Sequence, residues 1–407
     1  MSKPILRWHR SKPVGSSQWL ARPNVKVVHS FYRSTQPSGE NETVLKQVAL
    51  LSDYGINVEL VYLTSDDLES RPLAKALTAV GLATGTPLAA PPAHWFSDTD
   101  IVHIHNTFPS MSHEWLGALE SPKVLTAHNY RAFCANGLFL RDDSRCMDCV
   151  TGGSVQAIRH ACYMDSRLKS IPVALQQSSK RSLKHLMNKC DRVILPGEPM
   201  RNIFRELGVR NTKVLHNPVP RIVRKPQSNA DSGHWLFVGR ISPEKGLVDL
   251  LREWPRTESL LVVGEGPQET AAKALALARR LDVRFLGRQD GQTVGDLMLA
   301  SLGLVFASKA LEGAPLVYGE AAQAGLPVLV AEGSTLATQV LADQTGATFS
   351  RTDAESLASG LRRIRATRDQ LSRRARNVYE KRYTPDVWIE QITEIYEAAI
   401  SAHGTRN

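Results

Sequence analysis

The chain has 407 residues, of which 42% are hydrophobic and 22% charged, so it has the composition of a folded globular protein. This length favours two domains over a single hydrophobic core. The formal net charge of +10 favours anionic partners, and no run of about 18 apolar residues is present that would span a bilayer.

The N-terminal segment does not resemble a secretory signal. Residues 1–19 contain Arg7, Arg10 and Lys12, but no apolar run follows these charges. We therefore expect a cytoplasmic protein.

Short apolar runs alternate with helical segments through the first half of the chain. The predicted strands are residues 25–29, 58–63, 101–104, 123–126 and 193–195, and the first predicted helix is 43–54. This alternation favours βαβ units that build a parallel sheet. Residues 1–216 are therefore predicted to form one Rossmann-like domain.

Residues 217–233 contain three prolines and no sustained periodicity, which predicts a linker at the start of the second domain. The alternation then restarts, with predicted strands at 235–238, 259–263, 283–286, 302–306 and 327–330, and late helices at 354–364 and 369–380. We predict a second Rossmann-like domain over residues 217–384 and a last helical segment, 385–407, that packs back toward the first domain. Ligands of doubly wound sheets bind beyond the carboxyl ends of the strands, so the predicted site lies in a cleft between the domains.

Two turns in the second half follow predicted strands and carry candidate site residues. Arg240 and Lys245 lie just beyond the strand at 235–238, where two cations can neutralise a leaving diphosphate, although solvated basic turns are also common. Gly264 and Gly266 follow the next strand and allow the backbone to approach a ligand closely. A glycine-rich turn alone is a weak signal.

A third segment, 312–320, follows a strand and opens a predicted helix. Glu312 stands in the loop and can accept hydrogen bonds from sugar hydroxyls. Glu320 lies about two helical turns further along, on a similar face, and can reach a ribose diol. The backbone between them is placed at a helix N-terminus, which favours a diphosphate, and comprises Gly313, Ala314, Pro315 and Leu316.

Together these segments resemble the retaining glycosyltransferases of family 4, also called group 1, whose GT-B fold has two Rossmann-like domains facing across a cleft. The matching motifs, in order, are Gly239-Arg240, Glu244-Lys245-Gly246, Gly264-x-Gly266-Pro267, Phe285-Leu286-Gly287, Glu312-x7-Glu320 and Ala324-Gly-Leu-Pro-Val328.

The resemblance implies a role for each matched residue. Arg240 and Lys245 would bind the donor diphosphate beside the backbone of Gly239. Glu320 would bind the ribose and Glu312 the transferred sugar. Pro315 departs from the family, in which glycine is common there, and it has no N–H to donate to the sugar.

The first half also resembles the polysaccharide-biosynthesis members of this family. Residues 31–40 match the family's Gly-containing loop, in which Gly39 would approach the donor. Residues 126–131 match its His-containing motif, which implies that His128 lies near the anomeric carbon. Without the resemblance, a histidine after a strand is more often structural, and His103 and His105 keep that interpretation.

The resemblance implies a metal-independent, front-face mechanism. No carboxylate in the matched motifs is an obvious nucleophile, so the departing phosphate oxygen would take the acceptor proton. Arg240 and Lys245 would stabilise the leaving diphosphate, and no catalytic cofactor is expected.

Four cysteines lie close together in the sequence, within a segment, 134–162, that we expect to be a loop. Their spacing fits a structural zinc site, reduced thiols without metal, or a redox role. The four are Cys134, Cys146, Cys149 and Cys162.

Basic residues concentrate in 167–192 and 362–382. We interpret these basic residues either as solvated helix faces or as a contact with an anionic membrane surface. No motif in the sequence predicts nucleic-acid binding. The expected partners are a nucleotide-sugar donor and a sugar or lipid-linked acceptor at the inner membrane face.

Two other functions fit parts of the pattern: a GT-B enzyme of the nucleotide-sugar epimerase type, and a non-catalytic sugar-nucleotide-binding protein. The joint presence of Arg240, Lys245, Glu312 and Glu320 favours an active enzyme. Slow hydrolysis of a nucleotide sugar without acceptor would separate a transferase from a binding protein.

Overall fold

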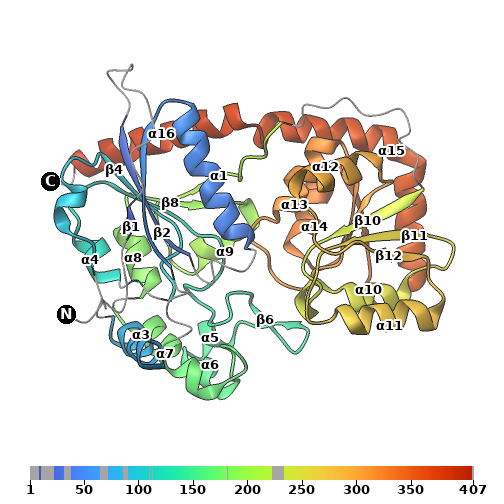
Figure 1. Cartoon of the computed structure of the whole chain (residues 1–407), viewed down its shortest axis with the longest axis horizontal. Coiled ribbons are helices and arrows are strands. Elements are labelled where there is room, and N and C mark those ends of the chain that lie inside the picture. The colour runs from blue at the N-terminus through green and yellow to red at the C-terminus, as the bar shows by residue number, and fades with distance from the viewer. Residues whose placement is uncertain are drawn as a thin grey trace. The chain divides into compact units, whose positions relative to one another are not determined.

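The computed structural model describes residues 9–10, 23–31, 38–64, 72–85, 90–109, 111, 113–180, 182–221 and 233–405 (Figure 1). The chain divides into two compact units. Unit 1 comprises Met1–Phe139, Cys146–His216 and Trp388–Asn407, and unit 2 comprises Leu140–Arg145 and Asn217–Val387. Most of the predicted linker, 222–232, and the predicted loop at 32–37 lie outside the described residues.

Unit 1 contains a seven-stranded sheet in the order β1-β3-β2-β4-β5-β8-β9. All neighbouring strands are parallel except β1, which pairs antiparallel with β3. The strands are β1 (His9–Arg10), β2 (Asn24–Phe31), β3 (Asn57–Thr64), β4 (Ile101–Ile104), β5 (Lys123–Thr126), β8 (Arg192–Leu195) and β9 (Thr212–Val214).

Helices surround this sheet. The helices of unit 1 are α1 (Gly39–Asp53), α3 (Pro72–Thr84), α4 (His113–Ala118), α5 (Asp148–Thr151), α6 (Val155–Arg159), α7 (Arg167–Ser178), α8 (Leu183–Lys189), α9 (Glu198–Glu206) and the short 3-10 helix Ala93–Phe96. On one face, α1 and most of α16 (Pro385–Gly404) pack on β2, β3 and β4 through a core that includes Val44, Leu51, Trp388 and Ile392.

Unit 2 contains a six-stranded, all-parallel sheet in the order β12-β11-β10-β13-β14-β15. Numbered within the unit, this is 3-2-1-4-5-6, the order of a dinucleotide-binding Rossmann sheet. The strands are β10 (His234–Val238), β11 (Ser259–Val263), β12 (Val283–Phe285), β13 (Leu304–Phe306), β14 (Val328–Ala331) and β15 (Gly346–Phe349). The chain order reverses between β10 and β13, which is where such sheets bind ligands.

Both faces of the unit 2 sheet are covered because its central strands, β10, β11, β13 and β14, are almost entirely apolar. Alternate residues enter two separate cores: Trp235 and Phe237 face one, and Leu236 faces the other. The helices are α10 (Leu247–Glu253), α11 (Glu269–Arg279), α12 (Gly291–Ala300), α13 (Leu316–Ala324), α14 (Thr335–Asp343), α15 (Ala354–Arg382) and the 3-10 helix Pro243–Lys245.

Every predicted strand is present, and the two late helices are one helix, α15, interrupted at Thr367, which has non-helical backbone angles. The prediction of a loop over 134–162 is wrong in part. This segment contains α5, α6 and the hairpin β6 (Leu140–Arg141) to β7 (Ser144–Arg145). Asp142 and Asp143 both have positive φ in its two-residue turn, a conformation usually signalled by Asn-Gly or Asp-Gly.

A cluster of histidines is buried between the unit 1 strands and α16. His103 Nδ1 lies 2.8 Å from the Tyr396 hydroxyl, and its Nε2 lies 2.8 Å from Thr126 Oγ1. His29 is hydrogen-bonded to Asn41 at 3.0 Å. Burial lowers the pKa of His29 to about 4 and that of His103 to about 3.

These depressed pKa values predict that the protein loses stability as the pH falls below about 6.5. The unfolded chain then takes up protons on histidines that the folded core keeps neutral, at a cost of about 1.4 kcal/mol per pH unit for each one. Urea unfolding at about pH 7.5 and about pH 5.5 measures the effect, in a window where ordinary carboxyl groups scarcely titrate. Identical unfolding midpoints would contradict the burial of neutral histidines.

Candidate functional site

The first part of the candidate site lies in unit 2, where the chain leaves β10. Gly239 and Arg240 follow the strand, and the turn after β11 packs directly against them. A Cβ on Gly264 would overlap the carbonyl oxygen of Gly239, and a Cβ on Gly266 would overlap that of Ile241. These glycines therefore allow the turn after β11 to approach the chain's own backbone. This contact holds the loop that carries Arg240 in place.

The loop after β10 is also joined to the loop after β13. The backbone oxygen of Glu244 accepts hydrogen bonds from Lys309 N at 2.8 Å and from Ser308 Oγ at 3.1 Å. This connection brings together side chains that are 67 residues apart: Lys245 Nζ lies 2.9 Å from Glu312 Oε1. The two loops meet at the carboxyl ends of β10 and β13, where the strand order reverses.

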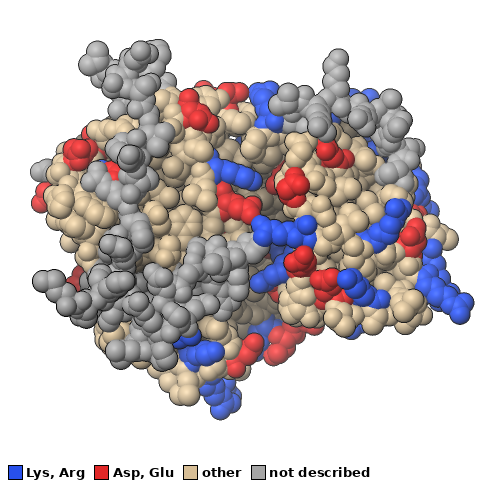
Figure 2. Space-filling model, in the orientation of Figure 1, with Lys and Arg blue, Asp and Glu red and all other residues tan. Residues whose placement is uncertain are grey.

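Two cations and two carboxylates form two ion pairs at this point of unit 2. Arg240 pairs with Glu244, and Lys245 pairs with Glu312. Burial alone would raise the pKa of Glu244, but hydrogen bonds from Ser242 and Arg240 and the charge of Arg240 bring it below the ordinary value, so Glu244 is ionised. The Arg240 side chain is 65% exposed and therefore accessible to a ligand. Figure 2 shows basic and acidic side chains intermixed over this unit.

The segment after Glu312 leads into α13, which begins only at Leu316 with Pro315 as its N-cap. No side chain caps this end, so the N-terminal amides of α13 face a position suited to an anion. Gly313 and Ala314 lie in the loop before the helix. The prediction that Glu312 and Glu320 share a helical face is wrong, because the proline places the helix start after Glu312. Glu320 is partly buried in the second turn of α13.

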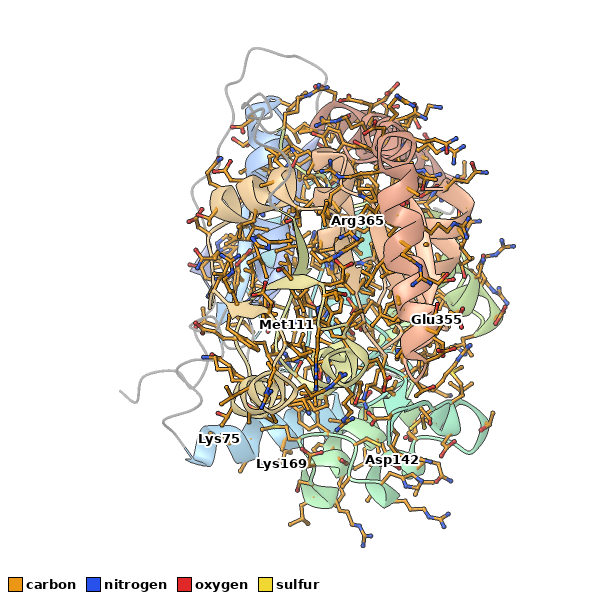
Figure 3. All side chains as sticks on the ribbon, turned by 90° about the vertical axis from the view of Figure 1, so that its right-hand side faces the viewer. Lys75, Met111, Asp142, Lys169, Glu355 and Arg365 are labelled. Atoms are coloured by element: carbon orange, nitrogen blue, oxygen red, sulfur yellow. The ribbon has the colours of Figure 1, made fainter. Side chains whose placement is uncertain are left out.

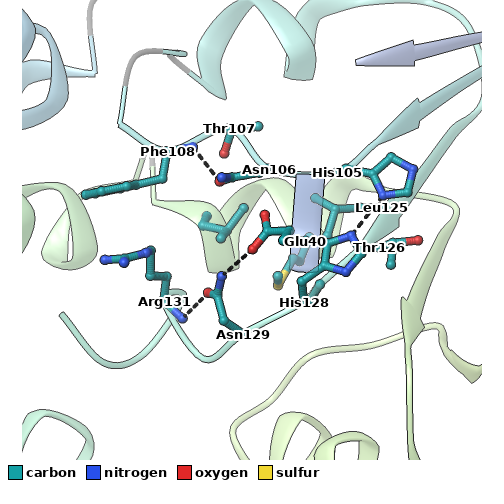
Figure 4. A pocket seen from close by; sticks show the side chains of 13 residues that line it. Glu40, His105, Asn106, Thr107, Phe108, Leu125, Thr126, His128, Asn129 and Arg131 are labelled. Carbon is teal, nitrogen blue, oxygen red and sulfur yellow. Dashed lines mark hydrogen bonds between the residues drawn. The ribbon is translucent and has the colours of Figure 1, made fainter. Parts of the chain in front are cut away.

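The second part of the candidate site is a pocket in unit 1 (Figure 4). It lies at the carboxyl ends of β4 and β5, beside the N-terminus of α1, and α8 contributes apolar side chains to its wall. The residues that line it are Glu40, His105, Asn106, Thr107, Phe108, Leu125, Thr126, Ala127, His128, Asn129, Arg131, Leu183 and Met187. Gly39, the first residue of α1, precedes the pocket residue Glu40 and is exposed.

Glu40 occupies the middle of the pocket (Figure 4). Its Oε2 accepts a hydrogen bond from Asn129 Nδ2 at 3.3 Å, whereas its buried Oε1 has no hydrogen-bond partner among the described residues. Burial raises the pKa of Glu40, and the charge of Arg131 and the hydrogen bond from Asn129 only partly offset the rise. A buried carboxylate oxygen without a donor is costly, so the pocket is suited to a ligand hydroxyl.

His128 forms the neighbouring wall of this pocket. Its Nε2 lies 2.9 Å from Nδ1 of His105, and burial lowers the pKa of His128 to about 4. The ring is therefore neutral at pH 7, and it can donate or accept a hydrogen bond without adding positive charge. His105 lines the pocket and positions His128, whereas His103 is bonded to Thr126 and Tyr396 inside the core.

Sequence reasoning did not select several of these residues. Glu40, Asn129 and Arg131 belong to the matched segments 31–40 and 126–131, but their residue types alone did not mark them as site residues. The available signal was position, because each lies just beyond a strand end or at the start of the helix that follows one. Arg131 stacks its guanidinium 4.3 Å from the centre of the Phe108 ring and donates to the Ala135 carbonyl oxygen at 2.9 Å.

The four clustered cysteines lie in unit 1, and no disulfide joins them. Burial, together with the nearby Cys134, Cys162 and Cys146, raises the pKa of Cys149 to about 12. Among the described residues, no group of three or more His, Cys, Asp or Glu side chains has the placement of a metal site. The predicted structural zinc stays a prediction that metal analysis of the purified protein can test.

Sequence comparison matches most of the chain to two models of glycosyltransferases. Residues 219–381 match glycosyl transferases group 1, and residues 48–221 match glycosyltransferase family 4. A search of curated proteins gave no significant match.

Three solved structures illustrate the similarity of the fold. HepE from Anabaena in complex with UDP is 18% identical, with a TM-score of 0.59 over 92% of this chain and 100% of its own. Sucrose-phosphate synthase from Thermosynechococcus elongatus is 17% identical, with a TM-score of 0.65 over 94% and 100%. A glycosyltransferase from Rickettsia africae is 11% identical, with a TM-score of 0.60 over 93% and 99%.

The two sequence matches together cover residues 48–381, and the two sheets of the structure are those of paired Rossmann-like domains. The chain therefore belongs to the GT-B glycosyltransferases of group 1 and family 4.

Proposed function

We propose that this glycosyltransferase transfers a sugar from a nucleoside diphosphate donor to a hydroxyl of a glycan or lipid-linked acceptor, with retention of configuration. The observation that carries the proposal is the meeting of Arg240, Lys245 and Glu312 at the point where the unit 2 strand order reverses. Crystal structures of HepE with UDP and with UDP and glucose make a UDP-sugar the first donor to test.

In this proposal, Arg240 and Lys245 bind the diphosphate, and the uncapped N-terminus of α13 adds a further positive field. Each cation already has a carboxylate partner, so it is held in place before the donor arrives. Glu312 accepts hydrogen bonds from hydroxyls of the transferred sugar, and Glu320 does so from the ribose. Pro315 offers no N–H, so the sugar is held there by side chains and neighbouring amides.

The chemistry follows from these charges. As the glycosidic bond breaks, positive charge develops on the sugar and negative charge on the leaving phosphate, and the two cations stabilise the latter. The phosphate oxygen takes the proton of the acceptor hydroxyl, which attacks from the same face. A neutral His128 donates a hydrogen bond to the sugar without opposing the developing positive charge.

The unit 1 pocket is proposed to bind the acceptor hydroxyl or a neighbouring one. Glu40 Oε1 is a buried acceptor, and Asn106, Asn129 and Arg131 supply polar groups around it. An acceptor hydroxyl that donates to Oε1 would restore the hydrogen bond that the carboxylate lacks.

An anionic membrane surface is proposed as an additional partner, because a lipid-linked acceptor would lie there. Among the described residues, none of the helices combines the length and apolar character that crossing a bilayer requires. Any such contact would therefore be made by the protein's surface.

Replacement of Glu312 with alanine is expected to lower turnover by about 10- to 100-fold, because a charged hydrogen bond to the sugar is lost. The Lys245–Glu312 pair is partly exposed, so unfolding free energy should change by less than about 1 kcal/mol. Initial rates with saturating UDP-sugar measure turnover, and Glu380→Ala, at an exposed ion pair on α15, is the control. A Glu312→Ala rate equal to that of the control removes Glu312 from the site.

Activity is expected to survive chelation. An Asp-x-Asp does occur at Asp98 and Asp100, but it precedes β4 at the strand's amino end, and Asp100 accepts a hydrogen bond from Asn24 N at 2.7 Å. It is therefore remote from the carboxyl-end loops of its own sheet. Transfer assayed with and without EDTA tests this expectation. Loss of activity with EDTA and recovery with magnesium or manganese would refute a metal-independent mechanism.

Replacement of Glu40 with glutamine is expected to raise KM for the acceptor about tenfold while the donor KM is retained, because the amide accepts a hydrogen bond less strongly than a carboxylate. The raised pKa of Glu40 also predicts an acid limb in the wild-type pH–rate profile that is displaced upward from an ordinary carboxyl group. That limb should disappear in Glu40→Gln. The exposed Glu42→Gln serves as the control, and an unchanged pH profile in Glu40→Gln would count against its role.

A further inference from the structure

Exposed apolar side chains concentrate on one part of unit 1. Ten large hydrophobic side chains among the described residues are exposed, and six of them lie on α3, on α6, on α7 or in the turn between α6 and α7. The six are Val80, Val155, Met164, Leu168, Ile171 and Leu175. α7 packs against both α3 and α6, so the six side chains belong to one layer of helices.

Helix α7 presents the most regular part of this surface. Leu168, Ile171 and Leu175 follow one another at intervals of three and four residues, which places them on one helical face. They are 79%, 37% and 49% exposed, respectively. The opposite side of the helix is buried, with Val173 and Ala174 in the small core shared with α3 and α6. The exposed stripe therefore serves no packing function within the described chain.

The same layer is basic. The described residues 75–84 and 155–178 contain Lys75, Arg159, Arg167 and Lys169, all exposed, against a single acidic residue, Asp165. Figure 3 places Lys75 of α3 and Lys169 of α7 at the same end of the unit. Arg167 and Lys169 flank Leu168 in the first turn of α7, where the helix dipole also favours negative charge.

We infer that α7 docks on an anionic lipid surface, with the stripe Leu168, Ile171 and Leu175 inserted between headgroups and the basic side chains on the phosphates. A helix with one apolar face and flanking Lys and Arg is the form that binds at the membrane interface. The long basic side chains extend from the apolar face to the headgroups while their stems remain on it. This inference specifies the surface behind the proposed membrane partner and rests on that part of the proposed function.

The combination of exposed apolar side chains and basic residues on α7 favours a lipid surface over a protein partner. A specific protein interface would be marked by apolar anchors set in a concave, well-packed surface, whereas these side chains project from a convex helix. Binding to anionic lipid requires no such complementarity, and its strength depends on inserted apolar area and on positive charge.

Co-sedimentation with vesicles tests the inference directly. The full chain should bind vesicles of phosphatidylcholine with phosphatidylglycerol and bind pure phosphatidylcholine vesicles much more weakly. The double variant Leu168→Gln/Ile171→Gln should lose at least about tenfold in binding, because two inserted side chains become polar. Arg167→Glu/Lys169→Glu should lose about fivefold or more per altered charge, and only toward the anionic vesicles.

The matched control is Leu277→Gln on α11 of unit 2. Leu277 is 81% exposed, as Leu168 is at 79%, but it lies outside the basic layer. The inference is overturned if Leu277→Gln loses as much binding as the α7 variant, or if the wild-type chain binds neither vesicle. A wild-type dimer that Leu168→Gln/Ile171→Gln dissociates would also overturn it, by assigning the stripe to a second copy.

Calorimetry with UDP on the same proteins separates this inference from the proposed function. Normal UDP affinity in the α7 variant with lost vesicle binding supports the docking surface. Vesicle binding by a wild-type chain that binds none of UDP, GDP, ADP and dTDP refutes the donor proposal and leaves the docking surface intact.

Discussion

The hydrogen bonds from Lys309 N and Ser308 Oγ to the Glu244 carbonyl oxygen hold together the two loops on which the unit 2 site depends. Without these hydrogen bonds, the loop that carries Lys245 and the loop that carries Glu312 could move away from each other. The second requirement is the pair of glycines after β11, since any Cβ at Gly264 or Gly266 would push the Arg240 loop outward. The two cations that we propose to bind a diphosphate are therefore positioned mainly by backbone contacts between their loops, in addition to their own ion pairs.

Unit 1 uses burial in place of paired charges. His29, His103 and His128 are neutral because the core offers them little solvation, and the carboxyl group of Glu40 has one oxygen that the described protein leaves without a donor. The two units thus offer different environments. The loops of unit 2 carry two ion pairs, which suits the proposed binding of a diphosphate. The pocket of unit 1 combines His105 and His128 with Glu40 and Arg131, which suits the proposed binding of sugar hydroxyls.

Much of this architecture could be predicted from the sequence, because parallel strands buried on both faces leave continuous apolar runs such as those of β4 and β10. The carboxyl-end loops that carry Arg240, Lys245, Glu312 and His128 followed from those runs. The edge strands β9 and β15 were not predicted, because β9 has Val214 as its one apolar residue and β15 begins with Gly346. The helix start at Leu316 also went unrecognised, which misplaced Glu320 relative to Glu312. The proposed role of Glu40 depends on its burial by residues at the carboxyl ends of β4 and β5 and on α8, which are distant in the sequence, so the local pattern carries no information about it.

Isothermal titration of the wild-type chain with UDP, GDP, ADP and dTDP tests whether Arg240 and Lys245 hold a diphosphate. We expect saturable heat with at least one of these nucleotides and a loss of about tenfold or more in affinity in Lys245→Met, because a charge-assisted phosphate contact is removed. Lys273→Met, at the exposed ion pair on α11, should bind as the wild type does. No heat with any of the four nucleotides, or equal affinity in Lys245→Met and Lys273→Met, would contradict the account.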